Sequence, residues 1–398
     1  MLVEALTHHG LGRLSDGTLV PRVLPGEEVE ARGDGTWRVL RPSPDRVAPP
    51  CPHFALCGAC AVQHASDTFV AGWKAGIVQA ALAGQGIEGE VGPVLTSPPQ
   101  SRRRARLSGR RTKGGAILGF HARASDTVVD NPRCQVLSPA LMALRPALLD
   151  LVALAGSRSR EVTLTVTDSS EGADVALEGG HDLTPDLRVR AAAWAEGAGI
   201  ARLTWGEEPV AQRSRPLQRM GRARVVPPPG AFLQATREGE AALLSLVREA
   251  LGGASPIVDL FAGSGTFALP LAEDAEVHAV EGGRAMTEAL LLGWRGAPGL
   301  GRLTAEARDL FRRPLLPEEL RRFGAAVIDP PRQGAETQVA ALAEARVPVV
   351  AYVSCSPASF ARDARALLAA GYHMGLVTVV DQFRWSPHVE LFARFALA

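Results

Sequence analysis

The sequence predicts an α/β protein in which a Rossmann-like domain follows a small OB-like β-barrel and a central α+β domain. Three observations support this prediction. Strand-like and helical runs alternate after about residue 229, a mixed pattern precedes them, and short β-type runs separated by Gly, Asp and Pro extend to about Arg46. A chain of 398 residues is long enough for two to four domains. We place three domains at 1–47, 48–228 and 229–398.

Composition excludes several other classes of protein. Hydrophobic residues make up 46% of the chain and charged residues 21%, as in soluble globular proteins, so wholesale disorder is excluded. No run of about 18 uncharged apolar residues occurs, and the N-terminus lacks the basic and apolar segments of a signal peptide. We therefore expect a cytoplasmic protein without membrane contact, and a monomer because no coiled-coil pattern is present.

The N-terminal runs are the first elements in order. The segments LVEAL, GTLVPRVL, EEVEARG and TWRVLRP are short and separated by turn residues, which is typical of a small all-β barrel. A proline-rich stretch at 41–52 ends this region. A segment with three cysteines then leads to His64, and a helix is predicted from Asp67 to about Ala83.

The central region mixes both periodicities. RARLSG, AILGFHA, EVTLTVTD and ADVALEG alternate as strands do, whereas 138–156 is predicted as one amphipathic helix capped by Ser138. The net charge is only +1, yet a basic stretch without acids occupies 102–113. This stretch indicates contact with a polyanion on one face, and a solvated strand face is the alternative. Its members are Arg102, Arg103, Arg104, Arg106, Arg110, Arg111 and Lys113.

A glycine loop follows the first strand of the C-terminal region. The segment 257–262 is predicted as a buried strand, and Gly263-Ser-Gly265 is a turn that needs small residues. A helix then begins at Thr266, so backbone N–H groups can receive a ligand in this loop.

Acidic residues near the ends of the later strands indicate which ligand this is. Glu281 ends the next strand, where a carboxylate can bind the ribose hydroxyls of an adenosine ligand, and NAD would satisfy this pattern too. Asp309 follows a third strand, and Asp329-Pro-Pro-Arg332 ends a fourth. This set favours S-adenosylmethionine, and helix capping by the acids is the alternative.

Cys355 follows another buried strand, Val349–Val353, at the sheet edge where open α/β folds place ligands and reactive groups. An inert buried cysteine is the alternative. Carbon 5 of uracil attacks a methyl donor poorly, but thiolate addition at carbon 6 creates an enolate whose carbon 5 is nucleophilic. A base must then remove the carbon 5 proton. We expect Glu390 to do so, with His388 as a weaker candidate.

The other four cysteines form a candidate metal site. Cys51, Cys57 and Cys60 are close in sequence, and Cys134 lies further along the chain. Four thiolates suit either zinc or a [4Fe–4S] cluster, and the spacing alone leaves both open. Unassociated free cysteines are the remaining alternative.

Several motifs, in this order and with this spacing, resemble the S-adenosylmethionine-dependent RNA uracil-5-methyltransferase family. They are GAFLQ at 230–234, DLFAGSGTF at 259–267, VEGG at 280–283, DPPR at 329–332, YVSCSP at 352–357 and HVE at 388–390. The similarity covers nearly the whole chain. The N-terminal barrel resembles the family's TRAM domain, an RNA-binding module, and the central region resembles members that act on large-subunit ribosomal RNA.

The resemblance implies a class I methyltransferase that modifies a flipped-out uridine, in 23S ribosomal RNA more than in transfer RNA. It implies that Cys355 is the nucleophile, that Glu390 is the base and that the four other cysteines hold a [4Fe–4S] cluster. Phe232 and Gln234 fall where the family holds the target base. The family's cofactor-contacting positions correspond to Gln234, Phe261, Thr266, Glu281, Asp309 and Asp329. Contact with RNA phosphates is expected from Arg102, Arg103, Arg104 and Arg106.

The sequence departs from the family pattern at three places. Thr236 stands where the family usually has Asn, Ser356 replaces the Asn of SCNP, and FRWSP precedes HVE. Three other functions stay open: a transfer-RNA uridine methyltransferase, an amino-group methyltransferase with an Asp-Pro-Pro motif, and an inactive RNA-binding or ribosome-assembly protein. The presence of both Cys355 and Glu390 argues against the last of these.

Overall fold

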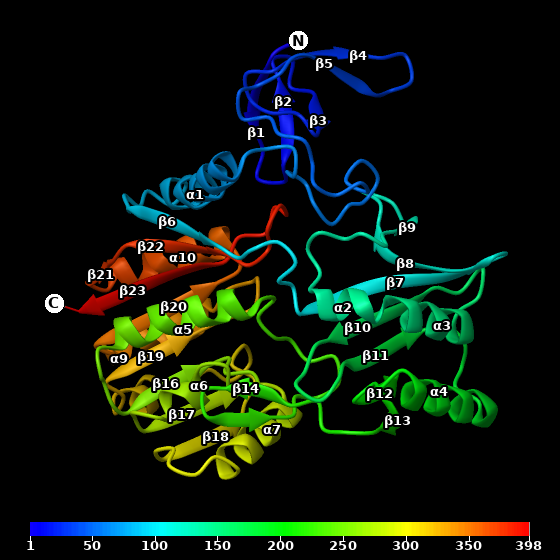
Figure 1. Ribbon diagram of the computed structural model, residues 1–398. Coiled ribbons are helices and arrows are strands. Elements are labelled where there is room, and N and C mark those ends of the chain that lie inside the picture. The colour runs from blue at the N-terminus through cyan, green and yellow to red at the C-terminus, as the bar shows by residue number, and fades with distance from the viewer. Residues whose placement is uncertain (398) are drawn as a thin grey trace.

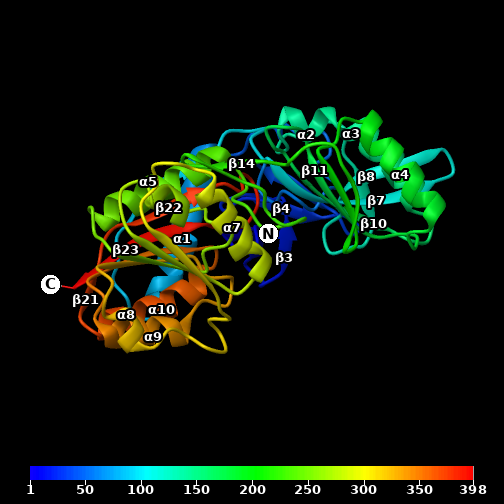
Figure 2. The same ribbon diagram turned by 90° about the horizontal axis from the view of Figure 1, so that it is seen from below.

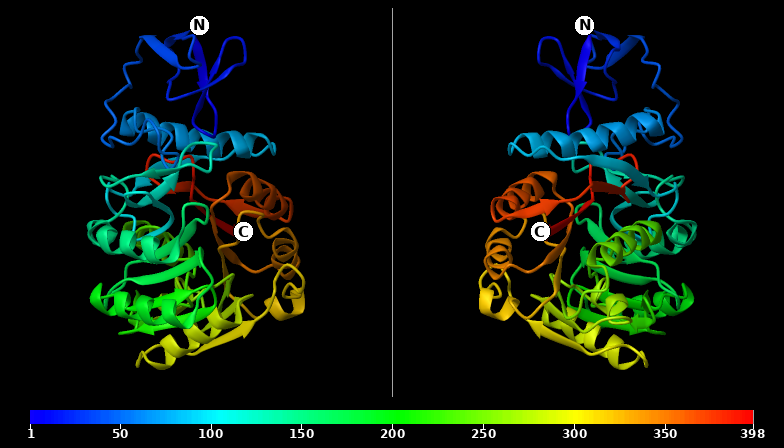
Figure 3. Two further views of the ribbon diagram at one scale, coloured as in Figure 1. Left: turned by 90° about the vertical axis from the view of Figure 1, so that its right-hand side faces the viewer. Right: turned by 90° about the vertical axis from the view of Figure 1, so that its left-hand side faces the viewer.

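The chain is described by a computed structural model over residues 1–397 and consists of three parts (Figure 1). Small N-terminal sheets stand above helix α1 (Asp67–Ala83), as the side views also show (Figure 3). A seven-stranded sheet and a nine-stranded sheet form two neighbouring lobes below them (Figure 2). Within the described residues, no helix has the length and apolar character needed to cross a membrane.

The N-terminal part consists of five short strands, which are β1 (Val3–Leu6), β2 (Leu11–Leu14), β3 (Leu19–Pro21), β4 (Glu28–Ala31) and β5 (Trp37–Arg41). The first three form one antiparallel sheet and the last two form another. Val3, Leu14, Val20 and Val29 come from both sheets and share one buried core, because alternate residues of a strand point to the same face. The predicted short β runs are therefore confirmed as strands.

The central part contains seven strands and three helices: β7 (Arg104–Thr112), β8 (Gly115–His121), β9 (Val128–Asp130), α2 (Pro139–Ala143), α3 (Arg145–Ala155), β10 (Val162–Thr167), β11 (Asp174–Gly179), α4 (Pro185–Gly197), β12 (Arg202–Trp205) and β13 (Glu208–Gln212). The strand order is β13-β12-β11-β10-β7-β8-β9. The prediction of one helix over 138–156 is wrong, because α2 ends and α3 begins on either side of Leu144. Pro146 has no N–H to bond to the carbonyl of residue 142, so the helix cannot continue through it.

The C-terminal sheet confirms the predicted Rossmann-like domain. Its helices and strands are α5 (Arg237–Leu251), β16 (Ile257–Leu260), α6 (Ala268–Leu271), β17 (Val277–Glu281), α7 (Arg284–Arg295), β18 (Leu303–Ala307), α8 (Pro317–Leu320), β19 (Ala325–Ile328), α9 (Glu336–Ala345), β20 (Val349–Ser354), α10 (Pro357–Ala369), β21 (Tyr372–Met374), β22 (Val377–Asp381) and β23 (Leu391–Leu397). Strands β16 to β20 pair in parallel, and β23 is antiparallel to β20. Strand order reverses between β16 and β19, which is where such sheets bind ligands. A hairpin of β14 (Gln218–Met220) and β15 (Ala223–Val225) precedes the sheet.

Helix α1 and strand β6 (Val91–Thr96) belong spatially to this sheet. The bounds of α1 match the prediction, and Ser66 caps it by accepting a hydrogen bond from the N–H of Phe69. The strand β6 pairs in parallel with β22, and α1 packs against α10 and β6. Our sequence division placed these residues with the central region. Pro93 inside β6 suits its position at the sheet edge, because an edge strand does not need every N–H.

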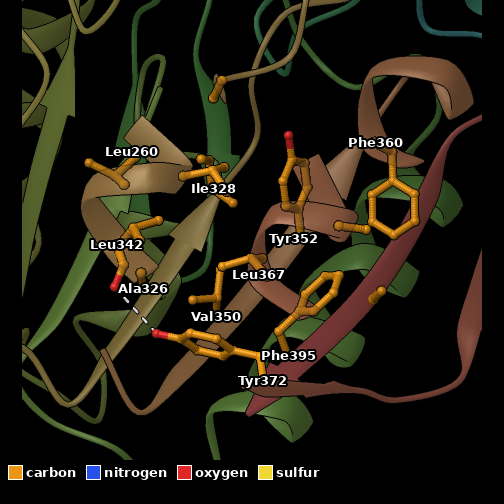
Figure 4. Packing of buried hydrophobic residues seen from close by; sticks show 14 of the residues in the cluster. Leu260, Ala326, Ile328, Leu342, Val350, Tyr352, Phe360, Leu367, Tyr372 and Phe395 are labelled. Atoms are coloured by element: carbon orange, nitrogen blue, oxygen red, sulfur yellow. Dashed lines mark hydrogen bonds between the residues drawn. The ribbon is translucent and has the colours of Figure 1, made fainter. Parts of the chain in front are cut away.

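The core of the large sheet makes its carboxyl edge rigid. Tyr352, Phe360 and Phe395 pack together on one face, as Figure 4 shows. The hydroxyl of Tyr352 donates to the carboxylate of Asp363 at 2.6 Å, and that of Tyr372 to the carbonyl of Leu342 at 3.3 Å. Strands buried on both faces need continuous apolar runs, which β19 and β20 have. The residues that follow these strands therefore start from fixed positions.

Candidate active site

One cavity of about 550 Å³ opens at the carboxyl ends of β16, β17, β19 and β20. It brings together the predicted catalytic, cofactor-binding and target-base residues from seven separate segments of sequence. These are Phe232, Gln234, Phe261, Thr266, Glu281, Asp309, Asp329, Cys355 and Glu390. The basic stretch and the four other cysteines lie outside it.

The glycine loop forms one wall of this cavity. Gly263 has a φ of +56°, and a Cβ built there would meet no atom within 4 Å, so this side of the loop borders open space. At Gly265, with a φ of +99°, a Cβ would lie 2.7 Å from the side chain of Leu269. The carboxylate of Glu281 accepts hydrogen bonds from the N–H of Gly263 at 2.9 Å and of Gly283 at 2.7 Å. The loop and the acid at the end of β17 therefore hold each other in position.

Aromatic rings and a second acid complete the cofactor side. The rings of Phe261 and Phe311 lie 5.3 Å apart at the cavity wall. Phe261 has a φ of +63°, a conformation unusual for an aromatic residue, which turns the chain sharply after β16. Asp309 is exposed, and one of its oxygens accepts from the N–H of Phe311 at 3.0 Å. Carboxylates for ribose hydroxyls, apolar ring faces and an open glycine loop fit an adenosine moiety.

A hydrogen-bonded chain of side chains joins the two carboxylates on the opposite wall. The amide of Gln234 donates to Asp329 at 3.3 Å and accepts from Gln382, which also donates to Glu390 at 3.1 Å. The carbonyl oxygen of Gln382 accepts from the N–H of Ala235 at 2.7 Å, which fixes its orientation. We did not predict Gln382. No motif marks it, because its role arises only when β22 and the segment after Phe232 meet.

These two carboxyl groups hold their protons more tightly than usual. Burial raises the pKa of Asp329 to about 7. Burial, and next to it the charge of Asp329, raise the pKa of Glu390 to about 8, although the donated hydrogen bond from Gln382 acts in the opposite direction. A carboxylate with a pKa near 8 is a strong enough base to take a proton at physiological pH.

Cys355 lines the same cavity as this pair. Burial, followed by the charges of Glu390 and Asp329, raises the pKa of its thiol to about 11, while Arg332 lowers it. Partial burial and the positive charges of Arg332 and Arg102 lower the pKa of His388 to about 4. The neutral ring of His388 can thus accept a hydrogen bond from Arg332, whose Nη2 lies 3.1 Å from Nδ1. This pKa makes His388 a poor base, and Glu390 stays the better candidate.

The loop that carries Glu390, residues 381–390, is held by distant parts of the chain. The ammonium of Lys74 in α1 is fully buried and contacts Asp381 at 2.6 Å and the carbonyl of His388 at 2.9 Å. The N–H of Ala61 in the cysteine segment donates to the carbonyl of Trp385 at 2.7 Å, where the φ of Trp385 is +62°. We call residues 381–390 the base loop.

The structure changes the interpretation of the basic stretch. Arg103 was predicted to contact RNA, but it is only 3% exposed, because it pairs with Glu240 and donates to the carbonyl of Gln234. Arg104 donates to the carbonyls of residues 230 and 231 at 2.9 Å, and its guanidinium lies 5.9 Å from the ring of Phe232. It therefore supports the segment that presents Phe232, which is 58% exposed at the cavity.

Two of the four arginines that were predicted to contact RNA phosphates remain accessible. Arg106 is exposed and forms an ion pair with Glu178 on the neighbouring surface. Arg102 is partly exposed and lies 5.8 Å from the ring of Phe383. An ion pair between exposed side chains is weak, so Arg106 can exchange its partner for a phosphate.

The four remaining cysteines gather between the N-terminal and central parts. The sulfur of Cys51 lies 4.0 Å from the carbonyl of Arg133, next to Cys134. Burial raises the pKa of Cys60 to about 12 and also raises that of Cys57, and the charges of the neighbouring cysteines add to both shifts. No three His, Cys, Asp or Glu side chains in residues 1–397 stand close enough together to hold a metal ion. The four-thiol donor set suits a metal or cluster, but the thiols converge without reaching ligand distance.

The sheet order, the open glycine loop at the switch point and the acids after successive strands define a class I methyltransferase that depends on S-adenosylmethionine.

Comparisons with known proteins give the family. The "Uncharacterized RNA methyltransferase" of Caulobacter vibrioides is 44% identical over 97% of this chain and 96% of that protein. The 23S rRNA (uracil(1939)-C(5))-methyltransferase RlmD of Halomonas elongata is 36% identical over 98% of this chain and 88% of its own length. No protein-family model matches the sequence. The chain belongs to the S-adenosylmethionine-dependent RNA uracil-5-methyltransferase family.

A solved structure agrees on the fold. The tRNA (uracil-54, C5)-methyltransferase of Pyrococcus abyssi, in complex with S-adenosyl-L-homocysteine, superposes with a TM-score of 0.75. The match covers 99% of this chain and 98% of that one at 22% identity. All three parts of the present fold are therefore found together in a solved structure.

Proposed function

We propose that the protein transfers a methyl group from S-adenosylmethionine to carbon 5 of a specific uridine in 23S ribosomal RNA. One observation carries the proposal: the thiol of Cys355 and the carboxylate of Glu390 line the same cavity as the glycine loop. A nucleophile and a base are needed together for methylation at carbon 5, whereas methylation of an amino group needs no thiol. The relative from Halomonas elongata, which is named for a uracil of 23S rRNA, supports the choice of RNA.

The positions of these two groups support the following reaction. Cys355, as thiolate, adds to carbon 6 of the uracil, and the electron pair displaced to carbon 5 takes up the methyl group, with S-adenosylhomocysteine as the leaving group. Glu390, as carboxylate, removes the proton from carbon 5. The bond between carbon 6 and sulfur then breaks, which restores the ring and the thiolate. Asp329 and Gln234 border the same space and are placed to hydrogen-bond the uracil edge.

S-adenosylmethionine, when bound, supplies the electrophilic methyl group. We assign its adenosine part to Phe261, Thr266, Glu281 and Asp309, and its remaining part to the space bordered by Gln234 and Asp329. The exposed ring of Phe232 stands at the cavity entrance, where it can stack on the flipped uracil. These residues bind and orient; the chemistry on the base is left to Cys355 and Glu390.

RNA binding is assigned to the two other domains. We propose an RNA-binding TRAM-like barrel at 1–47, a central domain at 48–228 whose α1 and β6 pack onto the catalytic sheet, and the catalytic domain at 229–398. Of the four arginines expected to contact RNA, Arg106 is exposed and Arg102 partly exposed, so both can contact phosphates without reading sequence. We expect the protein to act as a monomer in the cytoplasm.

We also propose that Cys51, Cys57, Cys60 and Cys134 hold a [4Fe–4S] cluster, with zinc as the less favoured alternative. The charges of Cys51, Cys57 and Cys134 all act on the thiol of Cys60, so the four thiols are neighbours in the fold and offer a four-thiolate donor set. Protein purified without oxygen should then be brown, with broad visible absorption and about four irons per chain. A colourless protein with one zinc ion per chain would contradict the cluster.

The function is tested by methyl transfer from labelled S-adenosylmethionine to unmodified 23S rRNA and, separately, to transfer RNA. We expect labelled 5-methyluridine in digests of 23S rRNA. The Cys355→Ala variant should bind S-adenosylhomocysteine normally but lose more than about 1000-fold in rate. Label on an amino group, or full activity of Cys355→Ala, would refute the proposal, and label in transfer RNA alone would refute the choice of RNA.

A further inference from the structure

A second cavity, of about 830 Å³, adjoins the first at Cys355 and is lined by no residue of the glycine loop. It shares Cys355 and Arg332 with the first cavity. One wall is a stripe of α1 that includes Trp73, Gly76 and Ile77, and the opposite wall is the start of α10. Its outer end is the turn between β1 and β2, which carries His8 and His9. The N-terminal part and the catalytic sheet thus both contribute to it.

The two cavities differ in charge. Four carboxylates line the first cavity: Glu281, Asp309, Asp329 and Glu390. No carboxylate lines the second, whose titratable side chains besides Cys355 are Arg332, His8, His9 and His388. Because no acidic side chain lines it, the second cavity repels a phosphodiester less than the first, and Arg332 and the imidazole nitrogens can contact it. The second cavity therefore suits a stretch of polyanion better than a sulfonium ligand.

The outer end of the second cavity presents aromatic surface. His8 and His9 are both exposed, and their ring centroids lie 3.8 Å apart. The indole Nε1 of Trp73 donates to the carbonyl of Thr7 at 3.2 Å, which ties the turn to α1. Gly10, with a φ of +75°, allows the turn to approach Ala61 closely. Any larger residue at position 10 would place its Cβ 2.8 Å from the side chain of Ala61. The turn that carries the two exposed imidazoles is therefore held against α1 and the cysteine segment.

We propose that this second cavity binds an unpaired nucleotide next to the target uridine, with its base stacked on His8 and His9 and its phosphate near Arg332. The inference rests on the proposed function. A uridine bonded to Cys355 is joined through phosphodiesters to its neighbours, so at least one of them must leave the thiol through adjoining space. The shared wall at Cys355 and Arg332 provides that route. Stacking on flat rings tolerates any base and needs no direct reading of sequence.

The test is a double-mutant cycle between the protein and the RNA. Short RNA loops that contain the target uridine are made with an abasic residue at each neighbouring position in turn. With the wild-type enzyme, one abasic position should lower kcat/KM by about tenfold. In His8→Ala/His9→Ala the intact loop should already show that loss, and the abasic change should add less than about twofold. His373→Ala, an exposed histidine on β21 away from the cavity, is the matched control.

A second variant blocks the cavity without removing a group. A Cβ at Gly76 meets no atom within 4 Å, so Gly76→Phe should fold and project its ring into the space. We expect a higher KM for RNA with an unchanged Kd for S-adenosylhomocysteine. Additive losses in the cycle, with methylation intact, would overturn this inference and leave the proposed function standing. Absence of any methylation by the wild-type enzyme would overturn both.

Discussion

The glycine loop and the base loop face the same cavity but are held in place by different means. The glycine loop is fixed by its own backbone and by Glu281 in the adjacent strand. The base loop is fixed by Lys74, which lies 307 residues before Asp381, and by the cysteine segment around Ala61. Binding on one side of the cavity is therefore encoded locally, whereas the position of the base depends on contacts across the whole chain.

Mutations in the two loops should therefore affect different properties of the enzyme. A change in the glycine loop should weaken the binding of the cofactor and leave the chemistry intact. A change in the contacts of the base loop should slow the chemistry and leave the binding of the cofactor intact. Because the cysteine segment contacts Trp385, loss of order around the four thiols should also slow the chemistry.

The largest effect is expected from Glu390→Gln. The amide keeps the hydrogen bond network but cannot take the carbon 5 proton, so kcat should fall by about 100- to 10,000-fold. Because addition and methyl transfer precede this step, a methylated protein–RNA complex should accumulate and survive denaturing gel electrophoresis. Normal turnover, or the absence of any complex, would show that another group is the base.

Lys74→Met tests whether distant contacts set the base loop. Breaking the buried ion pair should destabilise the fold by about 3–5 kcal/mol and lower kcat, with the Kd of S-adenosylhomocysteine unchanged. Lys113→Met, at an exposed turn, is the control for thermal stability. In Lys74→Met/Asp381→Leu the unpaired charge is gone, so stability should partly return. The carbonyls of Phe383 and His388 still lack the hydrogen bonds from Lys74, so kcat should stay low in the double variant. Full recovery of kcat would show that Lys74 does not position the base loop.

A smaller effect should appear in the pH dependence of the final step. In the covalent adduct Cys355 no longer titrates, whereas burial and Asp329 still raise the pKa of Glu390 to about 8. The rate of product release in single turnovers should therefore rise about tenfold per pH unit below pH 8 and level off above it. A rate that is already constant above pH 6 would show that the base has an ordinary carboxyl pKa.

The smallest effect is expected on the cofactor side. Glu281→Gln keeps the shape of the side chain but weakens the hydrogen bonds that a carboxylate makes to hydroxyls and to the loop. We expect the affinity for S-adenosylhomocysteine, measured by calorimetry, to fall about tenfold, with kcat at saturation within about twofold of wild type. A large drop in kcat would mean that the two sides of the cavity are coupled.

The same contrast explains what the sequence predicted. The α/β class, the helix over Asp67–Ala83 and the convergence of Cys355 with Glu281, Asp309 and Asp329 follow from local patterns, because the carboxyl ends of parallel strands in an open sheet meet at one edge. The single helix over 138–156 failed because the apolar periodicity continues through Pro146 while the hydrogen bonding does not.

Residues whose roles depend on long-range contacts could not be predicted. Gln382 bonds to Gln234, which lies 148 residues earlier, and nothing in its own segment indicates this. The sequence shows that Arg103 is basic but not that Glu240 covers it, so burial reversed its assignment. In the sequence, Lys74 is an ordinary lysine of a predicted helix. Its ion pair with Asp381 at the end of β22 arises only in the folded chain.

The central claim is that Cys355 bonds to carbon 6 of a uridine held between the two loops. The most direct test uses RNA in which the target uridine carries fluorine at carbon 5, because Glu390 cannot remove fluorine as it removes a proton. With S-adenosylmethionine present, we predict a stable methylated protein–RNA complex whose modified peptide maps to Cys355, and no complex from Cys355→Ala. Methylation of ordinary RNA without a trapped complex, or a complex at another residue, would contradict the account.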